Sequence, residues 1–211
     1  MRLTAGFLIP FHGQVAGDGC SEMCQCETDP CDFAASPSVN LASVVLALRP
    51  GDTLSLAAGN YAGSGNCGWK ITTNSADDRP ITVRGAEGAS LSTIIDCESA
   101  RPVVEGMVLG AHLRLERIHF TRAYRSGGGG GVLSADRGSR IMIENCRISK
   151  TTSDGEGGAL LVRNSSLLVY SSHFEENSAA EKGGALAIVD QSVATLKDNI
   201  VTHCFAPHGG T

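Results

Sequence analysis

The chain has few aromatic residues, few charged residues and no long apolar run. Aromatic residues make up 5% and charged residues 18% of its 211 residues. No stretch approaches the roughly 18 apolar residues that a membrane-spanning helix needs. The amphipathic runs rich in Ala, Glu, Lys and Leu that mark helical bundles are also missing. We therefore expect neither a transmembrane segment nor an all-helical fold.

Charge and composition limit the partners further. The apolar fraction of 42% is ordinary and the net charge of −5 is mild, which argues against disorder. A mildly acidic chain gives no reason to expect nucleic acid as a partner. Glycine is plentiful, at 26 residues, and it separates short runs rich in β-branched residues. This pattern predicts an all-β chain.

The first 37 residues form two segments. Residues 1–17 contain one early positive charge, a brief apolar stretch and small residues, the features of a secretory signal peptide. Because the stretch is short and contains Pro10, a truncated gene start is the alternative. Residues 18–37 are rich in cysteine and hold four of the chain's eight: Cys20, Cys24, Cys26 and Cys31. Their spacing lacks the two separated pairs of a zinc site, so we expect disulfides and no metal, in agreement with secretion.

An internal repeat dominates the rest of the chain. Glycine pairs recur with steps of 27, 26 and 26 residues, at Gly130, Gly157, Gly183 and Gly209. Apolar landmarks keep the same period, at Phe120, Ile148, Phe174 and Ile200. Two independent markers with one period indicate stacked structural repeats.

Aligning the repeats gives apolar columns separated by polar ones. The columns are Leu115, Ile143, Val169 and Thr195; Leu133, Leu160 and Leu186; and Ala135, Val162 and Ile188. Period-two alternation means short strands, and such strands bury their apolar side only when successive coils stack about 4.8 Å apart. We predict an all-β fold, a right-handed parallel β-helix of about 26 residues per coil. A sandwich of antiparallel hairpins is the alternative, and it would show turns every 8 to 12 residues without a long period.

The β-helix is expected to span 38–211. Its first residues, 38–48, have a helical pattern that ends before Pro50, and this short helix would cap the apolar column ahead of the first coil. The chain stops on the glycine landmark, so we expect a β-helix that is incomplete at its C-terminal end. The apolar columns that end in Leu186, Ile188 and Ile200 should then lie near an open edge, with end-to-end self-association and a weakly ordered last coil.

Several motifs resemble known β-helix proteins. The segment Gly51–Tyr61, followed by Arg79–Gly85, is similar to the opening coils of pectate-lyase-like β-helices. The elements Gly157-Gly158-Ala159-Leu160, Gly183-Gly184-Ala185-Leu186 and Phe174-Glu175-Glu176-Asn177 resemble the repeats of chlamydial polymorphic outer membrane proteins. The resemblance implies the fold over about residues 38–211. It leaves the function open, because the same coils serve enzymes, adhesins and surface proteins.

Candidate ligand-binding residues form what we call the basic strip. Two outward columns run through the repeats, one with His119, Arg147, His173 and Asn199 and one with Arg122, Lys150, Glu176 and Thr202. The basic strip consists of the basic residues of these two columns and of Arg117, which lies close to them in the sequence. Its members are Arg117, His119, Arg122, Arg147, Lys150 and His173. Cations that repeat once per coil suit an anionic polysaccharide. The alternative is that stacking aligns ordinary solvated side chains.

Other polar residues are weaker candidates. Glu116 and Glu144 are expected to stack on adjacent coils, with Asp96 and Glu98 one coil earlier. Paired acids serve glycosidases or Ca²⁺ sites, but stacking alone also brings them together, and we assign no catalytic residue. Asn145 is interpreted as a structural turn residue. Two further cysteines in strand contexts, Cys97 and Cys146, are expected to be buried free thiols.

The sequence favours a non-catalytic scaffold or adhesion-type module, secreted or on a cell surface, that presents its face to a glycan or a surface protein without a cofactor. Two alternatives remain: a fragment of a polysaccharide lyase, epimerase or hydrolase, and a purely structural repeat of a larger surface protein.

Overall fold

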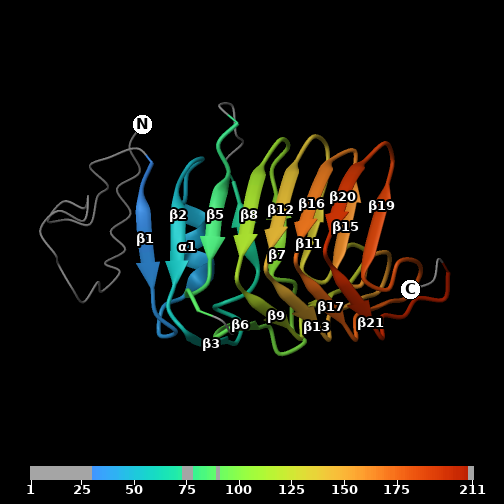
Figure 1. The fold of residues 1–211 in the computed structure, drawn as a ribbon, viewed down its shortest axis with the longest axis horizontal. Helices are drawn as coiled ribbons and strands as arrows, with labels where there is room; N and C mark the ends of the chain where they lie inside the picture. The colour runs from blue at the N-terminus through green and yellow to red at the C-terminus, as the bar shows by residue number, and fades with distance from the viewer. Residues whose placement is uncertain (1–29, 73–77, 89–90, 209–211) are drawn as a thin grey trace, which may run out of the picture.

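A computed structural model describes residues 30–72, 78–88 and 91–208. Within them the chain winds into a right-handed parallel β-solenoid of about five turns with one short helix near its N-terminal end (Figure 1). The predicted fold class is confirmed. Every strand pair is parallel, which excludes the antiparallel sandwich.

Two long sheets form two sides of the solenoid. Sheet 1 consists of β1 (Asp32–Ala35), β2 (Thr53–Leu56), β5 (Ile81–Arg84), β8 (His112–Glu116), β12 (Arg140–Glu144), β16 (Ser166–Tyr170) and β20 (Val193–Lys197). Sheet 2 consists of β3 (Gly59–Ala62), β6 (Thr93–Asp96), β9 (His119–Thr121), β13 (Arg147–Ser149), β17 (His173–Glu175) and β21 (Ile200–Thr202). Sheet 2 lies along the bottom of Figure 1.

Shorter sheets close the third side. One pairs β4 (Trp69–Ile71) with β7 (Val104–Met107), and another pairs β11 (Leu133–Ala135), β15 (Leu160–Arg163) and β19 (Leu186–Val189). The two are continuous, because the N–H of Val104 donates to the carbonyl of Val132 at 2.8 Å. A third short sheet joins β10 (Tyr124–Arg125), β14 (Thr152–Ser153) and β18 (Ser178–Ala179).

The core is a column of like residues stacked coil upon coil. Phe120, Ile148 and Phe174 are fully buried on the inner side of sheet 2. Trp69 packs edge-on against Phe120, with ring centroids 6.4 Å apart. The columns that begin at Leu133 and Ala135 pair as the repeat predicts. Burial of such side chains supplies the main stabilisation, because each contributes about 1.5–3 kcal/mol when removed from water.

The last coil is shifted by one residue from the predicted alignment. Phe174 pairs with Val201 and not Ile200, and Val169 pairs with Leu196 and not Thr195. The cause is an extra residue in the turn after β19. There Asp190 and Gln191 both adopt positive φ, whereas Asn164 alone does so one coil earlier. An alignment that assumes a constant period of 26 residues cannot detect such an insertion.

The predicted helix exists but is shorter than 38–48 and lies within the first coil. Helix α1 spans Leu41–Ala47, and the side chain of Asn40 caps it by accepting a hydrogen bond from the N–H of Ser43 at 3.1 Å. Strand β1 precedes α1 and pairs with β2, so a strand already stands before the helix. The helix packs beside β4 and buries its apolar face, which consists of Leu41, Val44, Val45 and Leu48. It therefore covers the third side of the core at this end.

Candidate functional site

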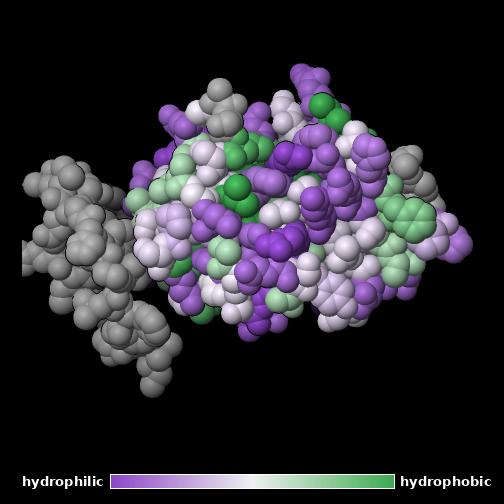
Figure 2. Space-filling model, turned by 90° about the horizontal axis from the view of Figure 1, so that it is seen from below, coloured by the Kyte–Doolittle hydropathy of each residue, from purple (hydrophilic) through white to green (hydrophobic). Residues whose placement is uncertain are grey.

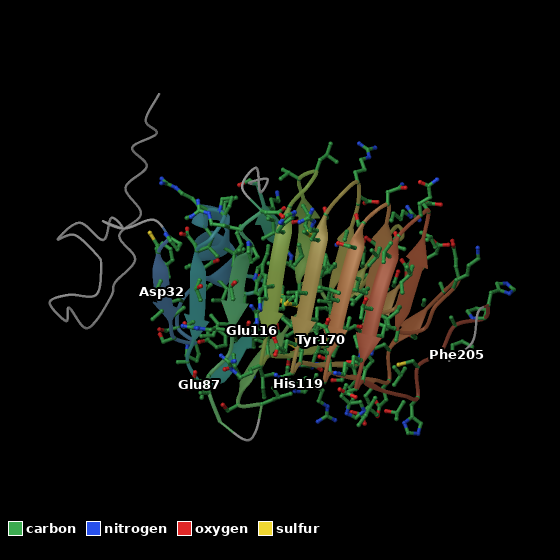
Figure 3. The ribbon with its side chains drawn as sticks, turned by 45° about the horizontal axis from the view of Figure 1, so that its top comes forward. Asp32, Glu87, Glu116, His119, Tyr170 and Phe205 are labelled. Carbon is green, nitrogen blue, oxygen red and sulfur yellow. A yellow bond between two sulfur atoms is a disulfide. The ribbon has the colours of Figure 1, made fainter. Side chains whose placement is uncertain are left out.

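The basic strip lies on the outer side of sheet 2 and along its two borders. His119, Arg147 and His173 occupy the same register position on β9, β13 and β17, as the repeat predicts. The fourth member of that column is Ile200 and not Asn199, because of the shifted last coil. Viewed from below, polar side chains gather over the middle of the molecule (Figure 2), and His119 is labelled toward the lower edge of the solenoid in Figure 3.

The remaining residues of the basic strip lie in tight turns at the ends of the strands of sheet 2. Arg117 precedes β9 with φ of 53°, and Arg122 and Lys150 follow β9 and β13 with φ of 48° and 55°. A left-handed residue turns the chain sharply while its N–H still pairs with the next coil, as the N–H of Arg117 does with the carbonyl of Glu144 at 3.0 Å. The corner column of Arg122, Lys150 and Glu176 continues to His203, which replaces the predicted Thr202.

Carboxylates accompany the cations of the strip. Arg122 forms an ion pair with Asp96, and Arg147 forms one with Glu175. Lys150 Nζ lies 3.9 Å from Glu176 Oε2, and Arg117 Nη1 lies 3.4 Å from Glu116 Oε2. The strip is therefore a surface of mixed charge whose cations alternate with acids. The sequence columns placed Lys150 next to Glu176, but they did not reveal the partners of Arg122 and Arg147, because each of those two pairs joins different columns.

The ion pairs shift the acidities of the carboxyl groups. The hydrogen bond from Arg147 holds the pKa of Glu175 below its usual range. Burial raises the pKa of Asp96, but the hydrogen bonds from Arg122 and from the N–H of Glu98 outweigh it, and the net pKa is lowered. Both carboxylates are consequently charged near neutral pH and remain partners of their arginines.

The two histidines of the strip are held by hydroxyl groups. His119 Nε2 lies 2.8 Å from Ser149 Oγ, and His173 Nε2 lies 3.1 Å from Thr202 Oγ1. Burial, followed by the positive charge of Arg147, lowers the pKa of His119 below 6.5. His119 is therefore a neutral hydrogen-bonding group at physiological pH.

A hollow of about 440 Å³ opens at the corner between sheets 1 and 2. Three strip residues line it, Arg117, Arg147 and His173, together with Asn145, Cys146 and Ser171. The loop after β5 contributes a separate wall, which consists of Ala86, Gly88 and Leu91. Asn145 has φ of 52° and an exposed side chain, so it is a turn residue that also borders this hollow. The repeat does not predict this wall, because the loop that forms it occurs in one coil of the described structure.

The four candidate acids do not form one site. Glu116 and Glu144 stack on β8 and β12 as predicted, but Arg114 lies between them, with its Nη2 3.0 Å from Glu144. Asp96 belongs to sheet 2 and pairs with Arg122, and Glu98 lies in the turn that follows. The stacked carboxylates are neutralised by arginine, which leaves no pair of opposed acids between them.

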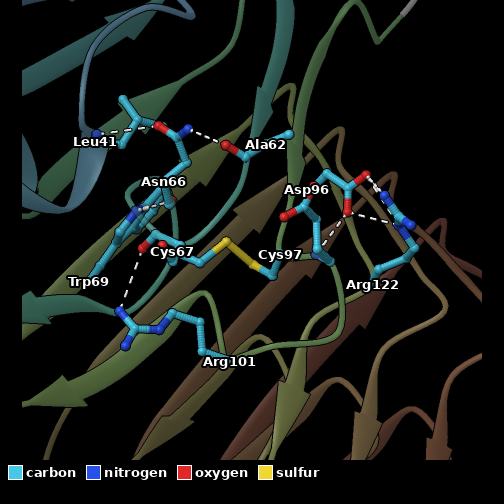
Figure 4. The surroundings of a disulfide bond; sticks show 11 residues. Leu41, Ala62, Asn66, Cys67, Trp69, Asp96, Cys97, Arg101 and Arg122 are labelled. Carbon is cyan, nitrogen blue, oxygen red and sulfur yellow. Dashed lines mark hydrogen bonds and ion pairs between the residues drawn. A yellow bond between two sulfur atoms is a disulfide. The ribbon is translucent and has the colours of Figure 1, made fainter.

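One cysteine prediction is wrong. Cys97 is not a free thiol: it forms a disulfide with Cys67, with Cα atoms 5.7 Å apart (Figure 4). A repeat of 26 hides the pair, because this coil is 34 residues long where Ala62 pairs with Asp96, and Cys67 lies four residues beyond the position that corresponds to Cys97. Cys146 is buried and free, as expected, and so is Cys204. Cys31 is disulfide-bonded, whereas Cys20, Cys24, Cys26 and the proposed signal peptide 1–17 lie outside the described residues.

Across 30–72, 78–88 and 91–208, no three His, Cys, Asp or Glu side chains come close enough to share a metal ion. The same part of the chain contains no helix long and apolar enough to cross a membrane.

Comparison with known proteins agrees with the fold. Residues 109–210 match the family model described as the right-handed β-helix region. A similar solved structure is a mannuronic acid specific polysaccharide family 6 lyase from human gut microbiota, at 14% identity and a TM-score of 0.42. The alignment covers 82% of this chain and 49% of the lyase, so the chain spans about half of that protein's length. No curated protein matches the chain.

Proposed function

We propose that this chain is a non-catalytic scaffold, secreted or displayed on a cell surface, that binds an acidic glycan along the basic strip. The supporting observation is the register of His119, Arg147 and His173 on three consecutive strands. Parallel strands repeat about every 4.8 Å, so the strip offers donors at regular intervals to an extended chain. Carboxylates beside the cations would set the affinity, because a ligand must compete with them.

The state of the acids supports a binding role over catalysis. A general acid needs a raised pKa and a general base needs room for substrate. Glu116 and Glu144 instead share Arg114, and Glu175 has a lowered pKa beside Arg147. The lowered pKa of Glu175 keeps that carboxyl group ionised near neutral pH, and Arg114 occupies the space between Glu116 and Glu144.

The cysteines support the proposed location. A disulfide between Cys67 and Cys97, together with a bonded Cys31, is typical of oxidising compartments. We therefore place the working protein outside the cytoplasm.

A second copy of the chain is the proposed protein partner. Sheet 1 has β1 at one end of its strand order and β20 at the other. Inward-facing residues of the last coil are about half exposed, namely Leu196 (49%) and Val201 (45%). Head-to-tail contact would cover these side chains and continue the parallel register, because an edge strand is a template for another strand.

The glycan proposal is tested by the binding of polygalacturonate, measured calorimetrically against neutral dextran of similar length. The double variant Arg122→Gln, Lys150→Gln should weaken binding several-fold and reduce its salt dependence. The matched control Lys70→Gln, Arg137→Gln removes two exposed cations elsewhere and should change little.

Three results would overturn the proposal. Equal affinity for dextran and polygalacturonate would show that the charge of the polymer does not contribute to binding. An absence of binding to either polymer would favour a purely structural repeat. Shortening of the polymer during incubation would favour the alternative, a polysaccharide-active enzyme.

A further inference from the structure

The arginines and the lysine of the basic strip are balanced by carboxylates. Each of these four cations forms an ion pair with one acid, and the pairs are Arg117–Glu116, Arg122–Asp96, Arg147–Glu175 and Lys150–Glu176. The lowered pKa values of Glu175 and Asp96 keep these two acids ionised near neutral pH. At the border with sheet 1, Arg114 faces Glu144 as well as Glu116, so it adds no unbalanced charge. The paired groups therefore give an approaching polyanion little net attraction.

Three histidines stand outside these pairs. His119 and His173 belong to the basic strip, and His203 ends the corner column beside it. Within the described part of the chain, none of the three forms an ion pair with a carboxylate. His119 and His173 instead lie against the hydroxyl groups of Ser149 and Thr202. A hydroxyl group accepts from a protonated ring and donates to a neutral one, so these contacts permit either charge state.

The surroundings of the histidines hold too little negative charge to neutralise them once they are protonated. The charged groups around His119 are Asp96 on β6, Arg147 and Lys150 on and after β13, and Glu175 on β17. His173 and His203 both face Glu175, which already binds Arg147. Burial, and then Arg147, lowers the pKa of His119, so this ring takes up its proton at a lower pH than an ordinary histidine. Protonation would thus leave the surface with net positive charge.

We propose that the basic strip binds an acidic glycan in a pH-dependent manner, because protonation of His119, His173 and His203 supplies the net positive charge that holds the ligand. This inference rests on the proposed function and names the regulation of its site. Histidine changes its charge between about pH 5 and 8, so binding would strengthen as the surroundings become mildly acidic. A bound anion also favours the charged form of a nearby histidine, so binding and proton uptake promote each other.

Dextran sulfate is the probe, because its sulfate groups stay ionised throughout and any pH dependence then belongs to the protein. Calorimetry of the full chain at constant ionic strength should show binding about tenfold or more tighter at about pH 5 than at about pH 7.5. Titrations near pH 6 in two buffers of different ionisation enthalpy should show uptake of roughly one to three protons per bound chain. Equal affinity at the two pH values, or an absence of proton uptake, would overturn the proposal.

Histidine variants locate the pH dependence. The triple variant His119→Gln, His173→Gln, His203→Gln should reduce the ratio of the two affinities to about twofold or less, because glutamine still forms hydrogen bonds but does not become charged. The control His208→Gln removes an exposed histidine beside Lys182, away from sheet 2, and should keep the full ratio. A full ratio in the triple variant would contradict the proposal. Circular dichroism at both pH values verifies the folding of each variant, and proton uptake by the wild type needs no variant.

One further variant tests the charge balance at neutral pH. Glu176→Gln removes the carboxylate beside Lys150 and keeps the shape of the side chain. The affinity for dextran sulfate at about pH 7.5 should then rise about threefold, because the surface gains net positive charge. An affinity no higher than that of the wild type would mean that paired carboxylates do not limit binding, and it would also contradict the proposal.

The two levels of the hypothesis fail differently. If the wild-type chain binds dextran sulfate equally well at both pH values, the pH dependence is wrong, while glycan binding along the basic strip still stands. If the chain binds neither dextran sulfate nor polygalacturonate at either pH, both the inference and the proposed function are wrong.

Discussion

Asn177 and Thr151 are joined by two hydrogen bonds across neighbouring coils. The amide oxygen of Asn177 lies 3.0 Å from the backbone nitrogen of Thr151 and 2.8 Å from its hydroxyl oxygen. The amide nitrogen of Asn177 donates to the carbonyl of Ile148 at 2.9 Å. Asn177 is fully buried, so water cannot replace these bonds. A single side chain thus satisfies several polar groups of the preceding coil.

The first prediction concerns this side chain. Asn177→Ala should lower the free energy of unfolding by about 2–4 kcal/mol, because buried groups of Thr151 and Ile148 lose their partner. The control Glu181→Ala changes an exposed residue and should stay within about 0.5 kcal/mol. Denaturant titration followed by circular dichroism measures both. A cost for Asn177→Ala no larger than that of the control would show that the amide is not a structural link.

The second prediction counts thiols. Unfolding without reductant should expose two reactive thiols per chain, those of Cys146 and Cys204, if the cysteines of 18–37 are all in disulfides. In the folded chain Cys146 should react slowly, since burial raises its pKa to about 12 and leaves little thiolate. Mass spectrometry after alkylation gives the count. Six thiols, or one bound zinc per chain, would contradict disulfides among Cys20, Cys24, Cys26 and Cys31.

The third prediction is the titration of His119. Its pKa in the folded chain should lie below 6.5, because burial and then Arg147 disfavour the imidazolium. Arg147→Gln should raise that pKa, since it removes the positive charge and frees Glu175. A lowered folded pKa means that the unfolded chain binds the proton more readily. The contribution of His119 to the free energy of unfolding is therefore present above about pH 6.5. It is lost as the pH falls through the pKa that His119 has in the folded chain.

NMR titration of the histidine ring protons tests this directly. Lys182→Gln serves as the control, because it removes a cation near Glu156 on another side of the solenoid. A pKa of His119 that does not respond to Arg147→Gln would mean that the two side chains are not electrostatic neighbours in solution.

The fourth prediction concerns the last coil. Hydrogen exchange should show weaker protection after Lys197 than over residues 160–169, because the strand that follows Lys197, β21, is the outermost strand of sheet 2. Sedimentation should show association that rises with protein concentration. Leu196→Lys, Val201→Lys should suppress it by charging the inward-facing end. Val193→Lys, which changes an exposed residue on the outer side of sheet 1, should not.

The sequence was sufficient for the fold because stacking imposes its own pattern. Each inward residue must lie on a similar one, so Leu133, Leu160 and Leu186 recur with the period of the coil. The period fails where a turn changes length, as at Asp190 and Gln191, or where a loop intervenes, as before Cys67. Outward residues obey no such rule. The acids opposite Arg122 and Arg147, and the positions of Ala86, Gly88 and Leu91 at the hollow, depend on contacts that one sequence does not encode as a repeat.

The disulfide also determines how the molecule would bear a pulling force. Tension applied to the two ends of the described chain passes from Cys67 to Cys97 through the sulfur atoms, and the intervening residues carry no load. Coils toward the C-terminal end have no such bypass among the described residues, so each would unravel and release about 90 Å of extended chain from its 26 or so residues. The bypassed segment contains Ala86, Gly88 and Leu91, the wall of the hollow. Under load, the segment between Cys67 and Cys97 would therefore keep its length while the coils beyond it stretched.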